Sequence, residues 1–142
     1  MTSIVVKINY SSYNTFNNTN MLTENSENQI ASLLKALGQP VRIRIVLIIG
    51  EHESCVCHLE AILGIRQARI SQHLIALRNA GIVSTRRDGR HIYYRLENPK
   101  ILDLVYQTAE IIQVDTDPLK ALTNRIEPGC VCPRCAKEMA EC

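Results

Sequence analysis

The stretch that decides the fold is residues 55–96, CVCHLEAILGIRQARISQHLIALRNAGIVSTRRDGRHIYYRL. It contains two runs of apolar residues at helical spacing, which predict two consecutive helices. The first run is Leu59, Ile62 and Leu63, and the second is Ile70, Leu74 and Leu77. Gly64 and Gly81 follow the two runs, and a residue without a Cβ readily takes the left-handed conformation that ends a helix. The sequence therefore predicts a helix, a tight turn and a second helix over about 66–79.

The pattern changes from helical spacing to alternation after Gly81. Two short runs, 82–86 and 91–95, resemble strands, and Asp88-Gly89 stands between them. Asp-Gly between alternating runs is the strongest short-range signal of a hairpin. Two helices followed by a basic hairpin form a winged helix-turn-helix. The predicted fold class is therefore mainly α with a small β-hairpin.

The charge of this segment is one-sided, with seven arginines and one acid, Asp88, between residues 66 and 95. We expect this placement if the second helix enters a major groove and the hairpin lies along phosphates. The predicted base contacts are Gln67, Ser71, Gln72 and His73, and the predicted phosphate contacts are Arg69, Arg87 and Arg90. The alternative is a solvated, arginine-rich face on an ordinary helical domain. Charge, turn chemistry and apolar spacing together favour double-stranded DNA as the partner.

Two helices are expected before the Cys-Val-Cys segment. Residues 26–29, SENQ, fit a capping box that starts a helix, and Gly38 ends it. Pro40 suits the first turn of the next helix, which is apolar nearly all round and so belongs at the centre of the core. Its many β-branched residues leave a strand as the alternative. Gly50 ends this element, and Ser54 is the expected N-cap of the helix that follows.

Another helix is expected after Asn98-Pro99, with the asparagine as cap and the proline at the first position. Its apolar stripe, in a domain whose core is already filled, is expected to meet a second copy of the chain. A two-fold dimer would present two reading helices one DNA turn apart, roughly 34 Å. The predicted interface residues are Ile101, Leu104, Val105 and Ile112. The alternative is that this helix packs onto its own domain.

Length and composition predict three regions in a chain of 142 residues. These are a disordered N-terminal arm over 1–22, a winged-helix and dimerisation domain over 23–115, and a cysteine-rich tail over 116–142 that begins with a short helix. No apolar run approaches the ~20 residues that cross a bilayer, and no secretion signal is recognisable at the start. We therefore expect a cytoplasmic protein with no membrane contact. The formal charge of +2 does not oppose DNA binding, because the positive charge is clustered.

The six cysteines are clustered, with two at 55 and 57 and four within the last thirteen residues. In a chain without a secretion signal, such clusters indicate metal binding or redox activity rather than a disulfide framework. Thiolates select soft or borderline ions, and the dipole of a helix N-terminus is expected to lower the pKa of Cys55 and Cys57. Residues i and i+2 do not face each other on a helix. One ion can therefore hold both sulfurs only if the first helical turn is frayed or reshaped.

Several separated motifs occur in order along the chain: LGQPVRIRI at 37–45, SCVCHL at 54–59, ISQHL at 70–74, GIV at 81–83, RDGR at 87–90 and YYRL at 93–96. Over residues 27–113 the chain resembles the ArsR–SmtB family of metal-sensing transcriptional repressors. The resemblance implies a winged-helix homodimer, not an enzyme, that binds a palindromic operator and releases it when an inducer binds. It is greatest with members whose Cys-Val-Cys precedes the recognition helix. Those members answer to arsenite, antimonite, cadmium, lead or zinc.

The chain departs from the family pattern in four places. His58 stands where an Asp is usual, and Glu60 stands where some arsenite sensors have a third cysteine. Residues 1–54 contain no cysteine, although cadmium and lead sensors of this type take thiolates from an N-terminal arm. The last helix, 102–113, lacks the Asp/His set of the family's zinc site there, so we expect that site to be missing.

Two sulfurs are too few for an inducer, because arsenite takes three and cadmium or zinc usually four. The predicted ligand set is Cys55 and Cys57 with Cys130, Cys132 and Cys135, in the same or the partner subunit, and Cys142 is a spare. Two alternatives are a separate tail site and a tail without a sensing role. A rival from another class is a redox-sensing repressor that uses a reversible disulfide. The inducer, As(III)/Sb(III) or Cd(II)/Pb(II)/Zn(II), is left open by the residues.

Overall fold

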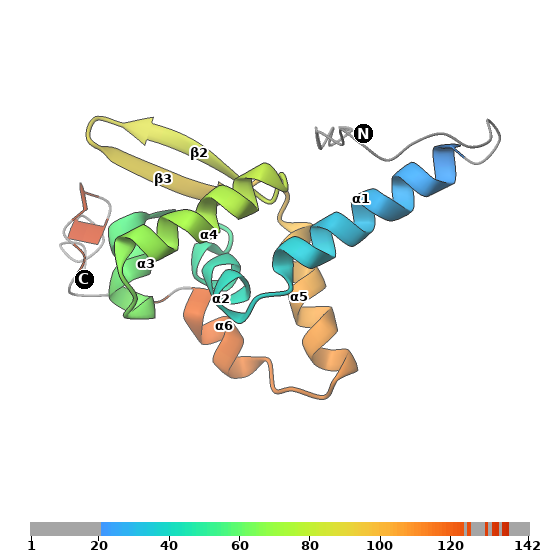
Figure 1. Cartoon of the computed structure of the whole chain (residues 1–142). Helices are drawn as coiled ribbons and strands as arrows, with labels where there is room; N and C mark the ends of the chain where they lie inside the picture. Colours follow the sequence, from blue (N-terminus) through green and yellow to red (C-terminus); the bar gives the residue numbers. More distant parts are fainter. Residues whose placement is uncertain (1–20, 124, 126–129, 131, 134, 137–142) are drawn as a thin grey trace.

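The computed structural model describes residues 21–123, 125, 130, 132–133 and 135–136. These residues form six helices and one three-stranded antiparallel sheet (Figure 1). The elements in chain order are α1 (Met21–Leu37), α2 (Pro40–Ile49), β1 (Glu53–Cys55), α3 (Val56–Leu63), α4 (Gln67–Asn79), β2 (Val83–Asp88), β3 (His91–Leu96), α5 (Lys100–Ile111) and α6 (Asp117–Thr123). The predicted winged helix-turn-helix, mainly α, is confirmed.

The core is built around α2, which is a helix and not the alternative strand. Pro40 occupies its first turn, where the missing N–H is not needed, and residues 45–49 are all buried. A helix that is apolar all round can only be stable in the interior. The face of α4 made by Ile70, Leu74 and Leu77 packs into the same core, and each of these three side chains is 0% exposed. This confirms the core-facing residues expected from helical spacing.

The turn between α3 and α4 depends on Gly64, as expected. Gly64 lies in the left-handed region at φ 65° and ψ 22°, and its N–H donates to the carbonyl of Glu60. The hairpin also forms as expected, with β2 and β3 paired from Val83↔Leu96 to Asp88↔His91. The connecting loop is the two residues between these last partners, and its glycine, Gly89, has φ 58°.

The expectation of a two-stranded hairpin is wrong in one respect, because β1 adds a third strand. The strand order is β1-β3-β2, so β3 is central and β1 pairs with it through Ser54↔Tyr94 and Cys55↔Tyr93. β1 is only three residues long, ESC, and has no alternation to reveal it. It exists because β3 supplies a pairing edge. The strand also carries the chain directly into α3.

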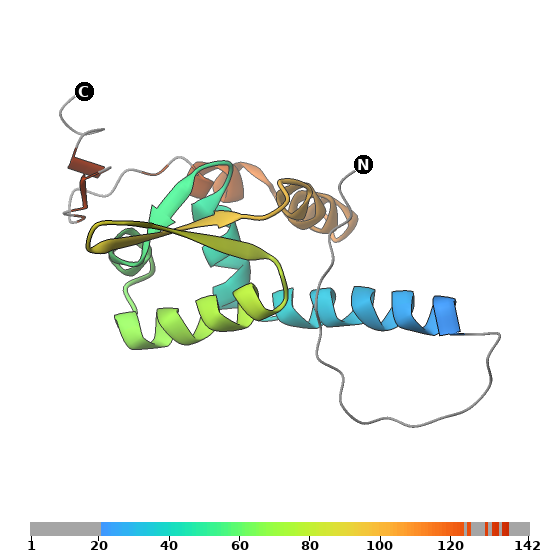
Figure 2. The same cartoon turned by 90° about the horizontal axis from the view of Figure 1, so that it is seen from above.

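α1 begins earlier than the capping-box signal indicates. The helix starts at Met21, so it includes the last two residues of the predicted arm, and residues 1–20 lie outside the described residues. Gln29 Nε2 donates to Asn25 Oδ1 at 3.3 Å, an i,i−4 contact that supports a continuous helix across Ser26. Ser26 is therefore inside the helix and is not its cap. α1 projects from the body on the side opposite the described tail residues (Figures 1 and 2).

The C-terminal segment folds back across the core before its cysteines begin. α6 falls within the expected short helix, and Tyr106 and Thr123 join it to α5 through hydroxyls 3.0 Å apart. Thr123 also lies so close to Gly50 that a Cβ atom at position 50 would collide with the Thr123 side chain. The described tail residues lie beside α3 (Figure 1), and their cysteines pack against Cys55 and Tyr93. No helix of the described chain has the length and apolarity needed to cross a membrane.

Candidate metal centre beside the wing

The candidate metal centre begins at the junction of β1 and α3. Cys55 is the last residue of β1 and the N-cap of α3, with extended backbone at φ −83° and ψ 163°. Its Sγ accepts a hydrogen bond of 3.3 Å from the N–H of His58. The prediction that Ser54 caps this helix is therefore wrong, because Ser54 is held in the sheet opposite Tyr94. A cysteine sulfur serves as the cap instead.

This geometry also removes the objection that two cysteines at i and i+2 of a helix point apart. Cys55 is not helical, so only Cys57 has the orientation of a helical side chain. No fraying of the first turn is required to bring the two sulfurs to one ion. The Sγ of Cys130 lies 3.7 Å from that of Cys55 and 3.4 Å from that of Cys57. Cys130, from the tail, thus contacts both Cys55 and Cys57 within one chain.

The tail contributes two further buried sulfurs. Cys132 is 1% exposed and Cys135 is 4% exposed, and the N–H of Cys135 donates to the Sγ of Cys132 at 3.5 Å. Cys132 and Cys135 therefore repeat the i,i+3 N–H to sulfur bond made by His58 and Cys55. Such bonds favour the thiolate and orient its lone pairs, as outer-shell donors do at metal sites.

Four sulfurs meet the spacing of a tetrahedral ion. Those of Cys55, Cys57, Cys130 and Cys132 all lie within 4.8 Å of one another, and the described cysteines are free thiols. Zinc–sulfur bonds of about 2.3 Å give sulfur–sulfur edges of about 3.8 Å in a tetrahedron. The distances from the sulfur of Cys130 to those of Cys57 and Cys55, 3.4 and 3.7 Å, are close to that edge. The donor set therefore fits a soft or borderline ion.

Burial sets the acidity of these thiols. It raises the pKa of Cys55 far above its ordinary value and raises that of Cys57 to about 11. The expectation that the helix dipole lowers these two pKa values is wrong, because desolvation outweighs it. Burial alone would raise the pKa of Cys132 too, but hydrogen bonds from the Cys135 N–H and from neighbouring thiols lower it to about 7. Burial also raises the pKa of Cys135.

His58 also lies in the cluster. It is half-buried, and its Nδ1 lies 3.3 Å from the Sγ of Cys135. His58, Cys130 and Cys135 form a second group whose donor atoms lie within 4.8 Å of one another. His58 is therefore a candidate ligand, and its position next to the Cys-Val-Cys motif was the only sequence signal for it.

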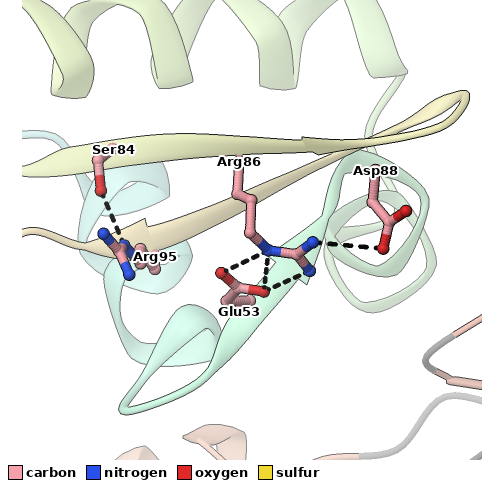
Figure 3. Close-up of polar contacts among 5 residues, drawn as sticks. All are labelled: Glu53, Ser84, Arg86, Asp88 and Arg95. Atoms are coloured by element: carbon pink, nitrogen blue, oxygen red, sulfur yellow. Dashed lines mark hydrogen bonds and ion pairs between the residues drawn. The ribbon is translucent and has the colours of Figure 1, made fainter.

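Tyr93 connects the cysteines to the wing, which is the hairpin of β2 and β3. The sequence did not reveal this role. It is 4% exposed and packs in one cluster with Cys55 and the tail cysteines. The guanidinium of Arg86 on β2 lies 4.9 Å from the centre of the Tyr93 ring. Arg86 also donates to Glu53 on β1, with a shortest contact of 2.8 Å, and to Asp88 at 3.3 Å (Figure 3). The candidate metal centre and the β2–β3 hairpin therefore share side-chain contacts.

The predicted DNA contacts occupy α4 and the hairpin. The exposed side chains among them are Gln67, Arg69, Gln72, Arg87 and Arg90. Ser71 is half-buried, and so is His73, whose Nε2 is buried without a hydrogen-bond partner in the described chain. Burial and the charges of Arg42 and Arg69 lower the pKa of His73. His73 is therefore less accessible than the outward-facing residue that we expected.

The predicted dimer residues on α5 divide between the core and an open apolar hollow. Ile101 is buried in the core of its own chain, so we remove it from the proposed interface. Leu104, Val105 and Ile112 line a hollow of about 320 Å³ with α1 residues that include Leu34. Ile112 is 64% exposed and Leu34 is 50% exposed. One side of α5 therefore packs on its own domain, and the other side remains uncovered in the described chain.

The fold and site together define a winged-helix DNA-binding regulator with a thiol cluster beside its wing. The family profile described as bacterial regulatory protein, arsR family, matches residues 39–85. The chain is 45% identical over 82 residues to the biofilm growth-associated repressor of Xylella fastidiosa, a match that covers 58% of this chain and 72% of the relative. The chain belongs to the ArsR family of bacterial transcriptional repressors.

Two further comparisons agree with this assignment. The chain is 45% identical over 74 residues to the arsenic resistance transcriptional regulator ArsR1 of Pseudomonas putida, covering 50% of this chain and 58% of that protein. The crystal structure of the transcriptional repressor BigR from Xylella fastidiosa superposes with a TM-score of 0.57 at 41% identity, covering 66% of this chain and 96% of that one. The chain is therefore a DNA-binding repressor and not an enzyme.

Proposed function

We propose that this repressor releases its operator when a thiophilic ion binds the sulfurs of Cys55, Cys57, Cys130 and Cys132. The observation that carries the proposal is the meeting of these four sulfurs within 4.8 Å. Two of them precede the recognition helix and two come from the tail, so the shared site forms within one chain. Cys135 completes the predicted ligand set at the edge of this group. A separate tail site is disfavoured, because the tail sulfurs contact the sensor sulfurs directly.

The donor chemistry restricts the inducer to soft or borderline ions. Four thiolates in a buried, closed group suit zinc, cadmium or lead, and three of them suit arsenite or antimonite. The similarity to an arsenic resistance regulator is consistent with a metal or metalloid inducer. X-ray absorption at the metal edge of the loaded protein measures the number of sulfur ligands and so distinguishes the two groups.

The route from the ion to the DNA runs through the sheet. Cys55 is paired with Tyr93, and Tyr93 lies under Arg86 of the wing. Glu53, two residues before Cys55, holds the same arginine. An ion that draws Cys55 toward the tail therefore acts on β1, and β1 is attached to the wing through Tyr93 and Arg86. The short turn from α3 to α4 offers a second route, because α4 is the proposed recognition helix.

The net charge of the ion-bound site also favours release of the DNA. A divalent ion binds thiolates, so its binding expels protons from thiols whose pKa values burial has raised. Four thiolates with one divalent ion leave a net charge of −2, which is more negative than the ion-free cluster, in which burial keeps Cys55 and Cys57 protonated. Negative charge placed beside a wing that binds phosphates lowers the affinity for DNA. The proposed site thus opposes DNA binding even without a large movement.

We also propose that the chain acts as a homodimer on a palindromic operator in the cytoplasm, where a DNA-bound regulator works. The uncovered apolar residues of α1 and α5 support a second copy as the occupant of their hollow, because both helices expose large side chains there. A two-fold pair sets two recognition helices against two half-sites.

The central experiment is an operator-release assay on reduced protein. A duplex is first selected from random sequences by metal-free protein, and its affinity is then measured with increasing arsenite, cadmium, lead or zinc. We expect one of these ions to weaken binding 5- to 150-fold, the usual range of such coupling. Cys55→Ser/Cys57→Ser and a chain ending at Gly129 should bind the duplex but fail to respond. Unchanged affinity of the wild type at every ion concentration would contradict the proposal.

The second candidate function, a thiol redox switch, has one observation in its favour. The sulfurs of Cys57 and Cys130 are 3.4 Å apart, close enough to form a disulfide with small movements. Peroxide would then release the duplex from ion-free protein, with loss of two thiols per chain. Release by peroxide alone, with no response to any ion, would favour the redox switch over ion sensing.

The dimer proposal has its own test, Ile112→Asp. A charge in the uncovered hollow should convert a dimer to a monomer in analytical ultracentrifugation and weaken operator binding by more than tenfold, because both half-sites are then no longer bound together. Ile75→Asp is the matched control for the sedimentation measurement alone, since Ile75 is 51% exposed and away from the hollow but lies on α4, the helix proposed to read DNA. A wild-type chain that sediments as a monomer at micromolar concentration would overturn the dimer.

A further inference from the structure

The cluster contains more donors than one ion can use. Five cysteine sulfurs and the Nδ1 of His58 form two overlapping groups, and Cys130 belongs to both. A tetrahedral ion takes four donors, and the first group supplies four sulfurs. Cys135 and His58 then remain, both against the same cluster and 3.3 Å from each other.

The spacing of the remaining pair is that of two ligands on one ion. Zinc bonds of about 2.3 Å to sulfur and about 2.0–2.1 Å to histidine nitrogen place the two donors about 3.6 Å apart at a tetrahedral angle. The observed 3.3 Å between Cys135 Sγ and His58 Nδ1 is near this value. Cys130 lies within 4.8 Å of both donor atoms and supplies a third. A site with three protein donors is complete when solvent takes the fourth position.

We propose that the cluster holds two thiophilic divalent ions bridged by the sulfur of Cys130. One ion is held by Cys55, Cys57, Cys130 and Cys132, and the second by His58, Cys130 and Cys135. The inference rests on the proposed function for the first ion and adds the second. The bridge is chemically ordinary, because a thiolate sulfur has more than one lone pair and can bind two ions at once.

Charge favours the pair of ions over a single one. Five thiolates with two divalent ions carry a net charge of −1, whereas four thiolates with one ion carry −2. The sulfurs of Cys130, Cys132 and Cys135 are nearly inaccessible to solvent, so the smaller residual charge costs less to bury. A bridging ligand must lie between the two ions. Cys130 lies in this position, because it contacts both Cys55 and Cys57 and belongs to both groups of donors.

The test counts ions on the reduced full-length chain with cadmium as the probe. After removal of free ion, elemental analysis should find two cadmium ions per chain, and ¹¹³Cd NMR should show two resonances that both couple to the β-protons of Cys130. Cys135→Ser and His58→Ala should each lower the count from two to one. His52→Ala is the matched control, because His52 is exposed and lies in the same part of the chain. It should retain two ions.

Two results would overturn the inference: saturation of the wild type at one ion, or retention of two ions by Cys135→Ser. The wild-type count needs no variant, so the proposal stays testable even if a substitution impairs folding. Its failure is separable from that of the proposed function. One bound ion with normal release of DNA removes only the second site, whereas two bound ions without release of DNA remove only the sensor role.

Discussion

Two buried clusters hold this chain together in different ways. The larger is aliphatic and joins α2, α3, α4, the hairpin and α5 around side chains such as Ile45 and Leu74, both 0% exposed. The smaller contains Cys55, Tyr93 and the three tail cysteines, with Cys57 at its edge. The residues of both clusters are largely buried, but the first buries far more hydrocarbon than the second.

The difference lies in what each cluster gains from burial. Aliphatic burial contributes roughly 25 cal/mol per Å², without regard to ions or pH. A thiol cluster gains little from hydrocarbon, and the tail that supplies half of it must close a loop of more than seventy residues, from Cys57 to Cys130. The ion of the proposed function would supply this stabilisation. We therefore expect the fold to be independent of the proposed ion and the arrangement of the tail to depend on it.

The largest effect should come from the aliphatic cluster. Leu74→Ala leaves a cavity at a fully buried position and should lower the free energy of unfolding by about 2–5 kcal/mol. Cys130→Ser, in ion-free protein, should cost less, on the order of 1 kcal/mol. Urea denaturation of both variants measures the contrast. Equal losses would show that the thiol cluster supports the fold as much as the aliphatic one does.

The next effect is stabilisation by the ion. Binding to the folded state alone should add about 2.7 kcal/mol at a hundredfold excess over the dissociation constant. Cys132→Ser, which removes one of the four grouped sulfurs, should lose most of this gain, and a chelator should reverse it in the wild type. Thermal unfolding with and without cadmium measures it. If Cys132→Ser is stabilised as much as the wild type, Cys132 is not a ligand.

A smaller effect is expected from removing the contact between β1 and the wing, because this contact is the proposed route from the ion to the DNA. Glu53→Gln removes the acid on β1 that holds Arg86 and should reduce ion-induced release of DNA several-fold, with little change in stability because the pair is partly exposed to solvent. Asp88→Asn is the matched control, since Asp88 contacts the same arginine but lies on the hairpin itself. If both variants respond alike, the connection through β1 is not the route.

The smallest effect is expected at Cys142, which lies outside the described residues. Cys142→Ser should leave the cadmium count, the thermal stabilisation and the release of DNA unchanged, because the sulfurs that meet in the cluster suffice without it. The same assays serve as the measurement. A loss of bound cadmium in this variant would add a ligand to the set proposed above.

Most of the fold could be predicted from local pattern. Helical spacing placed the buried face of α4, Gly64 marked the end of α3, and Asp88-Gly89 marked the hairpin, because each depends on residues close in sequence. β1 could not be predicted in this way. Three residues carry no periodicity, and the strand exists only because β3 offers it a partner.

The sequence by itself determined the winged helix, its arginine-rich reading surface and the presence of two cysteine clusters, since periodicity, turn chemistry and charge are local properties. Only the tertiary structure decided that Cys55 ends a strand, that His58 meets Cys135 and that Tyr93 lies between the sulfurs and Arg86. These contacts join segments separated by as many as 77 residues. Spacing along a chain cannot specify such contacts, because they depend on how α6 packs against α2 and on how the tail cysteines pack against the sheet.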